Sequence, residues 1–281
     1  MGAIFLIMCF PATLRALETD VFVVRDLTGK LSADRQAALT KDAREKLDKV
    51  LRFYGVGAKV ENPGKIRLEF DEPRGGTYST VFITVKEDNR RVRVVRIFGV
   101  DREPQMVAHK LTLAIFISSD KLVRNMMGIP MEARFGNPLT FPMCGFRPDE
   151  WVEAFRRKQS CMPLSELGPD HEHWGMPTRG GVPVVLNKPR QHVMYAQSGS
   201  FGDWLLASYG AEKMQRFWRL SEGGKRSWEE VFGLSPKDLE GRWLQSLEAN
   251  KTNEKKVEAL LNLLNRNPKD ACSDTPRLAG K

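Results

Sequence analysis

VAHKLTLAIF, at positions 107–116, is the stretch around which the fold of this chain can be built. If the segment is a helix, apolar residues lie on almost every side of it: Val107, Ala108, Leu111, Leu113, Ala114, Ile115 and Phe116. A helix that is apolar all round is buried among other elements, so the segment predicts a central helix. His109 is its one histidine, Lys110 follows it, and Leu113 stands one turn later.

The spacing around His109 can be compared with a zinc-protease motif. Such a motif needs histidines at i and i+4, which reach one metal from one face, and a glutamate general base after the first. The chain has Lys110 and Leu113 at those two positions. Spacing alone therefore favours a hydrogen-bonded core histidine over a metal ligand.

The residues before this helix predict a sheet that packs against one long helix. Segments 20–24, 65–70, 79–85 and 92–98 have the β-branched or alternating patterns of strands. Segment 32–55 repeats apolar side chains at helical spacing, with Ser32 as N-cap and Gly55 at its end. The expected fold class is α+β with a small, mostly antiparallel sheet, and the first structural unit spans residues 17–127.

After residue 127 the pattern changes to loops and helices. Residues 128–189 are rich in proline and predict a loop-rich connection, interrupted by a short helix that begins at Pro148. Residues 190–266 predict a helical C-terminal lobe, with one helix ending at Gly210 and others capped at Ser227 and Ser235. Residues 267–281 predict a flexible tail.

Residues 1–16 begin with a short apolar run, from Ala3 to Phe10, before Pro11. This length is typical of a secretory signal peptide and is too short to cross a membrane. No positive charge precedes the run, so a buried strand in a cytoplasmic protein stays open as an alternative. Export to the periplasm or the cell exterior is the favoured prediction, with no transmembrane segment in the mature chain.

The net charge is positive but weakly patterned. The chain has 44 Lys and Arg against 35 Asp and Glu, a formal net charge of +9. A nucleic-acid binder concentrates such charge on one face. The nearest cluster, NRRVRVVR at 89–96, has no interleaved aromatic residues. The pattern therefore argues against a nucleic-acid partner.

Three cysteines remain after the predicted leader: Cys144, Cys161 and Cys272. They allow one disulfide, most simply between Cys144 and Cys161. His171 and His173 stand two residues apart in a polar loop and would share a metal if the backbone were extended. Incidental histidines in a solvated loop are the simpler interpretation.

Two separated segments resemble parts of one enzyme superfamily. VRVVRIFGVDREPQMVAHKLTLAI, at 92–115, looks like the strand and active-site helix of the gluzincin-like (peptidase MA-like) zinc metallopeptidases. YAQSGSFGDWLLASYGAEKMQRFW, at 195–218, and SWEEVFGLSPKDLEGRWLQSL, at 227–247, are similar to the C-terminal helices of bacterial members. The resemblance implies an α+β peptidase core with a small sheet, a central helix and a helical C-terminal lobe.

The resemblance also implies a degenerate member that lacks the H-E-x-x-H motif. His109 takes the position of the first zinc ligand, Lys110 that of the general base and Leu113 that of the second ligand. The third ligand of the family is a glutamate. Its counterpart here is Cys144 in PMCGFRP, with Glu132 and Glu150 as alternatives.

These substitutions remove the zinc chemistry for physical reasons. Leucine has no lone pair, so at most two protein ligands remain where a catalytic zinc needs three and a water. The ammonium group of Lys110 repels a divalent cation, and a protonated lysine cannot deprotonate water. We therefore expect neither a bound metal nor another cofactor.

The favoured prediction is a catalytically inactive metallopeptidase-like protein that serves as a protein-binding, peptide-binding or structural module. The alternative is a hydrolase with relocated, non-zinc chemistry that uses Cys144 with His109, or the His171 and His173 loop. A nucleic-acid binder is a third, weaker hypothesis, and it predicts a steep dependence of binding on salt.

Overall fold

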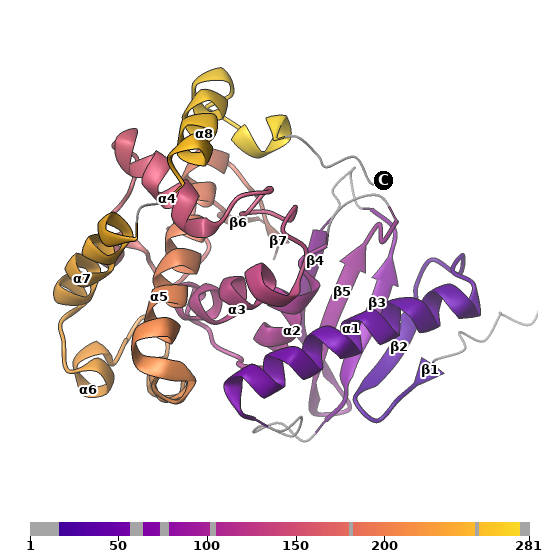
Figure 1. The fold of residues 1–281 in the computed structure, drawn as a ribbon. Coiled ribbons are helices and arrows are strands. Elements are labelled where there is room, and N and C mark those ends of the chain that lie inside the picture. Colours follow the sequence, from indigo (N-terminus) through magenta and orange to yellow (C-terminus); the bar gives the residue numbers. More distant parts are fainter. Residues whose placement is uncertain are drawn as a thin grey trace, which may run out of the picture.

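A computed structural model describes residues 17–56, 64–73, 79–101, 105–179, 182–250 and 253–275. A twisted sheet with one long helix across it forms one part of the molecule, and a group of helices forms the other (Figure 1). The predicted signal peptide, residues 1–16, lies outside the described residues.

The sheet is mixed. Its strands are β1 (Leu17–Glu18), β2 (Phe22–Asp26), β3 (Ile66–Asp71), β4 (Ser79–Glu87) and β5 (Arg90–Phe98), in the order β1-β2-β3-β5-β4. The pairs β2·β3 and β3·β5 are parallel, whereas β1·β2 and β4·β5 are antiparallel. The predicted α+β class is confirmed, but the expectation of a mostly antiparallel sheet is corrected, because the helix between β2 and β3 makes a crossover that allows parallel pairing.

Helix α1 (Ala33–Tyr54) is this crossover, and both of its predicted ends are confirmed. The Ser32 side chain accepts a hydrogen bond from Arg35 N, and Gly55 ends the helix with a left-handed backbone (φ 66°). One face of α1 is buried, with Ala43, Leu47, Val50, Leu51 and Tyr54 in the core.

Three helices form the centre of the molecule: α2 (Val107–Ile115), α3 (Lys121–Phe135) and α5 (Lys188–Leu220). Helix α2 follows β5 as predicted, and all its residues except Lys110 are buried. Small residues let α3 and α5 approach closely, since a Cβ on Gly202 would lie 2.4 Å from Met126 O. Gly210, with φ 83° and ψ 166°, breaks α5 at the predicted point.

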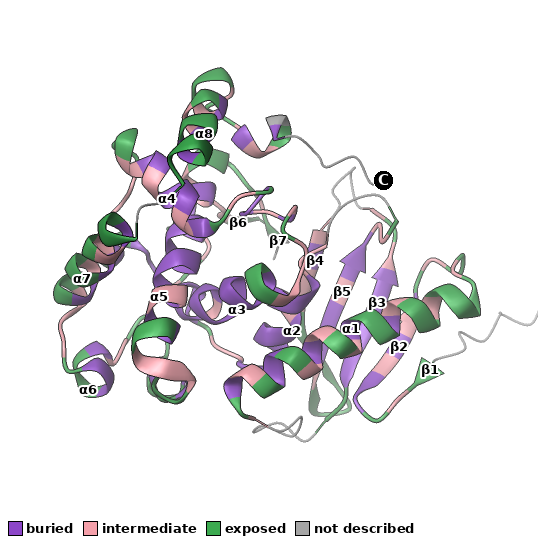
Figure 2. Ribbon diagram, in the orientation of Figure 1, coloured by how far each residue is buried: buried purple, intermediate pink, exposed green. Residues whose placement is uncertain are grey.

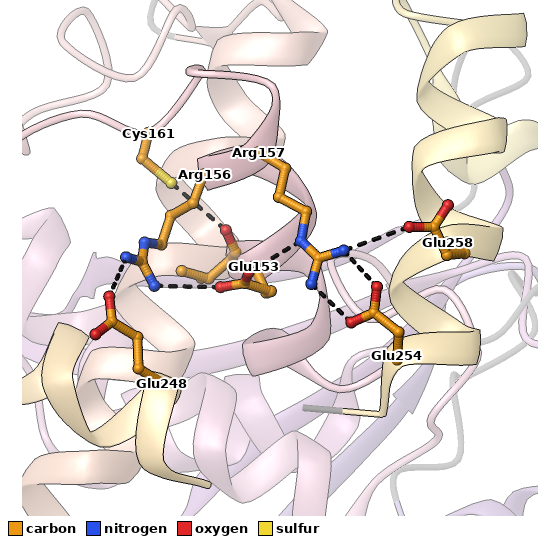
Figure 3. Close-up of polar contacts among 8 residues, drawn as sticks. Glu153, Arg156, Arg157, Cys161, Glu248, Glu254 and Glu258 are labelled. Carbon is orange, nitrogen blue, oxygen red and sulfur yellow. Dashed lines mark hydrogen bonds and ion pairs between the residues drawn. The ribbon is translucent and has the colours of Figure 1, made fainter. Parts of the chain in front are cut away.

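The outer helices are α4 (Pro148–Arg157), α6 (Trp228–Phe232), α7 (Pro236–Ala249) and α8 (Glu254–Arg266). Arg156 of α4 reaches Glu248 of α7 at 2.6 Å, and Arg157 reaches Glu254 of α8 at 2.6 Å (Figure 3). Glu153 pairs with both arginines from the same helix. These side chains are partly exposed, so each pair stabilises the fold by only about 0–1 kcal/mol.

The cysteine pairing differs from the sequence prediction. Cys144 is bonded to Cys272, and Cys161 is a free thiol that contacts Val152 O through its sulfur at 3.6 Å. The disulfide holds a short 3-10 helix, Ala271–Asp274, against the body of the protein. The prediction of a flexible tail is therefore corrected for residues 267–275, and residues 276–281 lie outside the described part.

One apolar core runs through the sheet part and the helical part (Figure 2). The predicted boundary between residues 127 and 128 falls inside α3, and the region 128–189 contains half of α3 and all of α4 besides its loops. Two-stranded pairing of β6 (Thr178–Arg179) with β7 (Val182–Pro183) and a 3-10 turn at Leu164–Glu166 complete this region. Among the described residues no helix is both long and apolar enough to cross a membrane.

Candidate functional site

His109 is completely buried on α2. Its imidazole packs against Gly128 of α3, where an added Cβ would lie 2.0 Å from His109 Cδ2. Among the described residues neither ring nitrogen has a hydrogen-bond partner. Burial, and then the charges of nearby cations, lower the pKa of His109 well below its usual value, so the ring is neutral. The prediction of a core histidine holds, and the side chain of Asn125 near the ring acts against the lowering of its pKa.

Glu132 is the third-ligand candidate that the structure brings next to α2. Its Oε2 accepts a hydrogen bond from the backbone N of His109 at 2.8 Å, and its Oε1 accepts one from Asn137 N at 2.9 Å. Burial raises the pKa of this carboxyl group to about 7. Glu150 instead helps to cap α4, and Cys144 is in the disulfide. Sequence spacing alone left these three candidates open.

The residues around His109 do not fit a zinc ion. Leu113 packs in the core and offers no lone pair, and both Glu132 oxygens already accept backbone hydrogen bonds. Within the part of the chain that the structure describes, His109 belongs to no group of three potential metal ligands. The surroundings of its imidazole are packed side chains, and a catalytic metal would need ligands that these side chains do not supply.

Lys121 is the most buried cation beside this helix pair. It lies at the start of α3, is 3% exposed, and its Nζ donates a hydrogen bond to Tyr195 Oη at 3.0 Å. The same Nζ is 4.8 Å from the ring centroids of Trp174 and of Tyr195. Burial, and then repulsion by Arg124, lower the pKa of Lys121 to about 7.

Lys110 and Arg124 lie close enough to Lys121 for the three charges to repel one another, and we call these three residues the cationic cluster. Burial is the main reason that the pKa of Lys110 falls to about 8, and the other two cations lower it further. The buried Nε of Arg124 has no hydrogen-bond partner. Across the described ranges, neither Lys110 nor Arg124 has a carboxylate within ion-pair distance.

The acidic groups near the cationic cluster are engaged elsewhere. Asp120 caps α3 by accepting from Leu122 N at 2.9 Å, and it pairs with Arg226 at 2.9 Å. Glu132 is held by two backbone N–H groups and has a raised pKa. The positive charge of the cluster is therefore only partly neutralised within the protein.

The two loop histidines do not act as a pair. Burial and then the charges of Lys121, Arg124 and Lys110 lower the pKa of His171 to about 4, which places its ring beside the cationic cluster. His173 is exposed, and its Nδ1 lies 2.7 Å from Asp170 Oδ1. In the described residues these histidines join no three-ligand group, so each has a separate environment.

The thiol-imidazole pair of Cys144 with His109, which the alternative hypothesis of a relocated hydrolase requires, is not formed. Cys144 is bonded to Cys272, whose sulfur lies 3.8 Å from Nε2 and 4.0 Å from Nδ1 of a different histidine, His192. Cys144 pairs with Cys272 because Cys144 lies in the loop before α4 and the C-terminal segment packs onto that loop. No local spacing in the sequence could indicate a pair separated by 128 positions.

Sequence reasoning also missed Lys121, Arg124 and Tyr195. The first two stand at i and i+3 of one helix, which places them on the same face, but such a pair is ordinarily solvated. Comparisons of the chain with protein-family models, with curated proteins and with solved structures find no match. The proposed function therefore rests on the contacts, burial and charge of the residues around His109 and Lys121.

Proposed function

We propose that this chain is a non-catalytic, metallopeptidase-like protein that binds an anionic group of a protein or peptide partner at the cationic cluster of Lys110, Lys121 and Arg124. The observation that carries the proposal is the only partly neutralised positive charge beside buried His109. It lies where the resemblance to zinc peptidases puts the catalytic metal.

The absence of zinc-dependent catalysis is supported by the groups around His109. Leu113 and Lys110 replace a ligand and a base, and the carboxylate of Glu132 is used to hold the backbone of α2. Peptide hydrolysis at this place would need a nucleophile or an activated water. The cysteine considered for that role, Cys144, forms a disulfide instead.

Binding of an anion is supported by electrostatics. Two opposite unit charges 4 Å apart attract by about 4 kcal/mol at an effective dielectric constant of 20. Below about pH 7, where both lysines are protonated, an anion beside the cationic cluster would meet three positive charges, and it would give the Nε of Arg124 a hydrogen-bond acceptor. Lys110, Arg124 and His171 are each partly exposed, so the cluster is reached from solvent.

The ligand class that follows is a carboxylate or phosphate group on a peptide or protein. Trp174 and Tyr195 are buried beside Lys121, so a ligand arriving from solvent would meet the partly exposed Lys110 and Arg124 first. Export is part of the proposal, because the disulfide between Cys144 and Cys272 persists in an oxidising compartment.

The first test is a calorimetric titration with sulfate, whose charge does not change near neutral pH. We expect saturable binding to the wild type and a loss of about tenfold in affinity, or 1.4 kcal/mol, for Lys110→Gln and for Arg124→Gln. Lys49→Gln removes an exposed charge from α1 and is the matched control. Absence of sulfate binding, or an equal loss in the control, contradicts the proposal.

The second test separates the sources of the anion. Acidic peptides, their glutamine counterparts and a phosphopeptide are titrated in parallel, and the bound class must be displaced by sulfate. The proposed absence of zinc-dependent catalysis is tested by measuring the metal content of the purified protein and by assaying proteolysis with and without a chelator. One zinc per oxidised chain that disappears in His109→Ala, together with chelator-sensitive proteolysis, would refute it.

A further inference from the structure

A second group of chemically active side chains lies at the junction of the C-terminal segment and α5. Cys144, His192 and Cys272 place their ligand atoms within 4.8 Å of one another, and the first two are buried. In this structure the two sulfurs form a disulfide with a Cα–Cα distance of 5.6 Å. The group shares no residue with the cationic cluster, and its binding of a metal is independent of the proposed anion binding.

His192 is oriented as metal-binding histidines are. Its Nε2 is 2.8 Å from Pro142 O, and since a carbonyl oxygen only accepts, Nε2 carries the proton and donates. In the neutral ring Nδ1 then keeps its lone pair; it lies 4.0 Å from Cys272 Sγ, and Nε2 lies 3.8 Å from the same sulfur. A ligating histidine usually donates its other N–H to a carbonyl or carboxylate, which fixes the ring and raises its basicity.

The surroundings of His192 are apolar and rigid. The rings of Phe141, Trp151 and Phe155 have centroids 5.1, 4.2 and 5.3 Å from that of the imidazole. A neutral imidazole and thiolates in a dry site form a donor set that suits Zn²⁺.

We propose that reduction of the disulfide converts Cys144, Cys272 and His192 into a binding site for one Zn²⁺ ion. A tetrahedral zinc with Zn–S of about 2.3 Å and Zn–N of about 2.0 Å separates its sulfur and nitrogen ligands by about 3.6 Å. Cys272 Sγ lies 4.0 Å from His192 Nδ1, close to that value, whereas the two sulfurs, bonded in this structure, have to separate to about 3.8 Å around the ion. The fourth position is taken by water.

Formation of the zinc site begins with reduction of the disulfide. A dithiol reductant gives two electrons and two protons to the Cys144–Cys272 bond and is itself oxidised to a disulfide. Zn²⁺ then binds the two sulfurs as thiolates, releases two protons, and takes the Nδ1 lone pair of His192. Either the disulfide or the metal would tie the Ala271–Asp274 segment to the loop of Cys144, so the same connection exists under oxidising and reducing conditions.

The experiment uses the full chain with Cys9→Ser and Cys161→Ser as the reference, so that Cys144 and Cys272 are its only thiols. Reduced and oxidised samples are titrated with Co²⁺ under inert gas, followed by displacement with Zn²⁺. We expect one equivalent of cobalt with a thiolate charge-transfer band in the reduced sample, and none in the oxidised one. Two protons should be released for each metal ion bound.

Two variants of the reference assign the ligands. Cys272→Ser lies at a partly exposed position and should weaken binding at least tenfold while keeping the circular dichroism of the fold. His192→Ala should do the same, and its folding is checked in the oxidised state, where the disulfide holds the segment. Equal cobalt binding in oxidised and reduced samples, or full affinity in folded Cys272→Ser, overturns the proposal.

Discussion

Replacing Lys121 with methionine is expected to stabilise the fold and to remove anion binding. Lys121 is 3% exposed, and burial lowers the pKa of its ammonium group from 10.5 to about 7. At 1.36 kcal/mol for each pKa unit, keeping this group charged in the folded state costs about 5 kcal/mol at low pH. Methionine keeps the length and flexibility of the stem and carries no charge.

Part of this gain is offset by lost contacts. The hydrogen bond from Lys121 Nζ to Tyr195 Oη contributes about 1 kcal/mol, and the approach to the rings of Trp174 and Tyr195 contributes about 2 kcal/mol. The expected net effect of Lys121→Met is therefore an increase of about 2 kcal/mol in the free energy of unfolding near pH 6. Sulfate binding should be lost in the same variant.

The pH dependence follows from the direction of the pKa change. Since the pKa of Lys121 is lower in the folded state, the unfolded state binds more protons between pH 7 and pH 10.5, and wild-type stability rises with pH over this range. The advantage of methionine should thus be largest below pH 7 and should shrink towards pH 10.5. Urea unfolding at pH 6, 8 and 9.5 measures it. A variant less stable than the wild type at pH 6, or a difference independent of pH, refutes the reasoning.

Three further outcomes are expected. Sulfate affinity of the wild type should fall as pH rises through about 7 to 8, where the two lysines of the cationic cluster lose their protons, and calorimetry at several pH values checks this. Gly128→Ala should destabilise the fold by about 1–3 kcal/mol because its Cβ would overlap the ring of His109, whereas Gly241→Ala, with open space around it, should be neutral or stabilising in the same urea experiment. Cys272→Ser should lower the melting temperature of the oxidised protein, because the bond to Cys144 closes a loop of 128 residues and such a loop contributes about 2–5 kcal/mol.

The elements of the fold could be predicted where the signal is local. Helical periodicity together with Ser32 and Gly55 gave both ends of α1, and Gly210 marked the break in α5. The all-round apolar pattern of residues 107–116 gave the buried central helix. Strand direction was wrong for β3 and its neighbours, because strand pattern does not distinguish a parallel from an antiparallel partner. The parallel pair β2·β3 depends on the crossover by α1, and the parallel pair β3·β5 depends on the chain passing through edge strand β4 first.

The candidate site was less predictable because its contacts join distant parts of the chain. In the sequence Lys121 resembles any lysine at the start of a helix. Its side chain is buried by the packing of Trp174 and of Tyr195, which lies 74 positions later. The partner of Cys144 lies beyond α8, and the nearest cysteine in sequence, Cys161, points to Val152 O instead. Interactions of this kind depend on how helices pack, which composition and periodicity do not determine.

The proposed relation to zinc peptidases gives the cationic cluster a simple electrostatic meaning. A catalytic zinc concentrates positive charge where a substrate carbonyl or carboxylate has to bind, and its ligands are neutral or anionic. In the proposed alignment Lys110 takes the position of the general base and Leu113 that of a ligand, while Lys121 and Arg124 add positive charge from the next helix. Side-chain cations can attract an anion as a metal does, but they cannot activate water, because a protonated ammonium or guanidinium group has no free coordination position and no lone pair. Under the proposed relation, the site would attract a negatively charged partner without the groups that zinc-dependent cleavage needs.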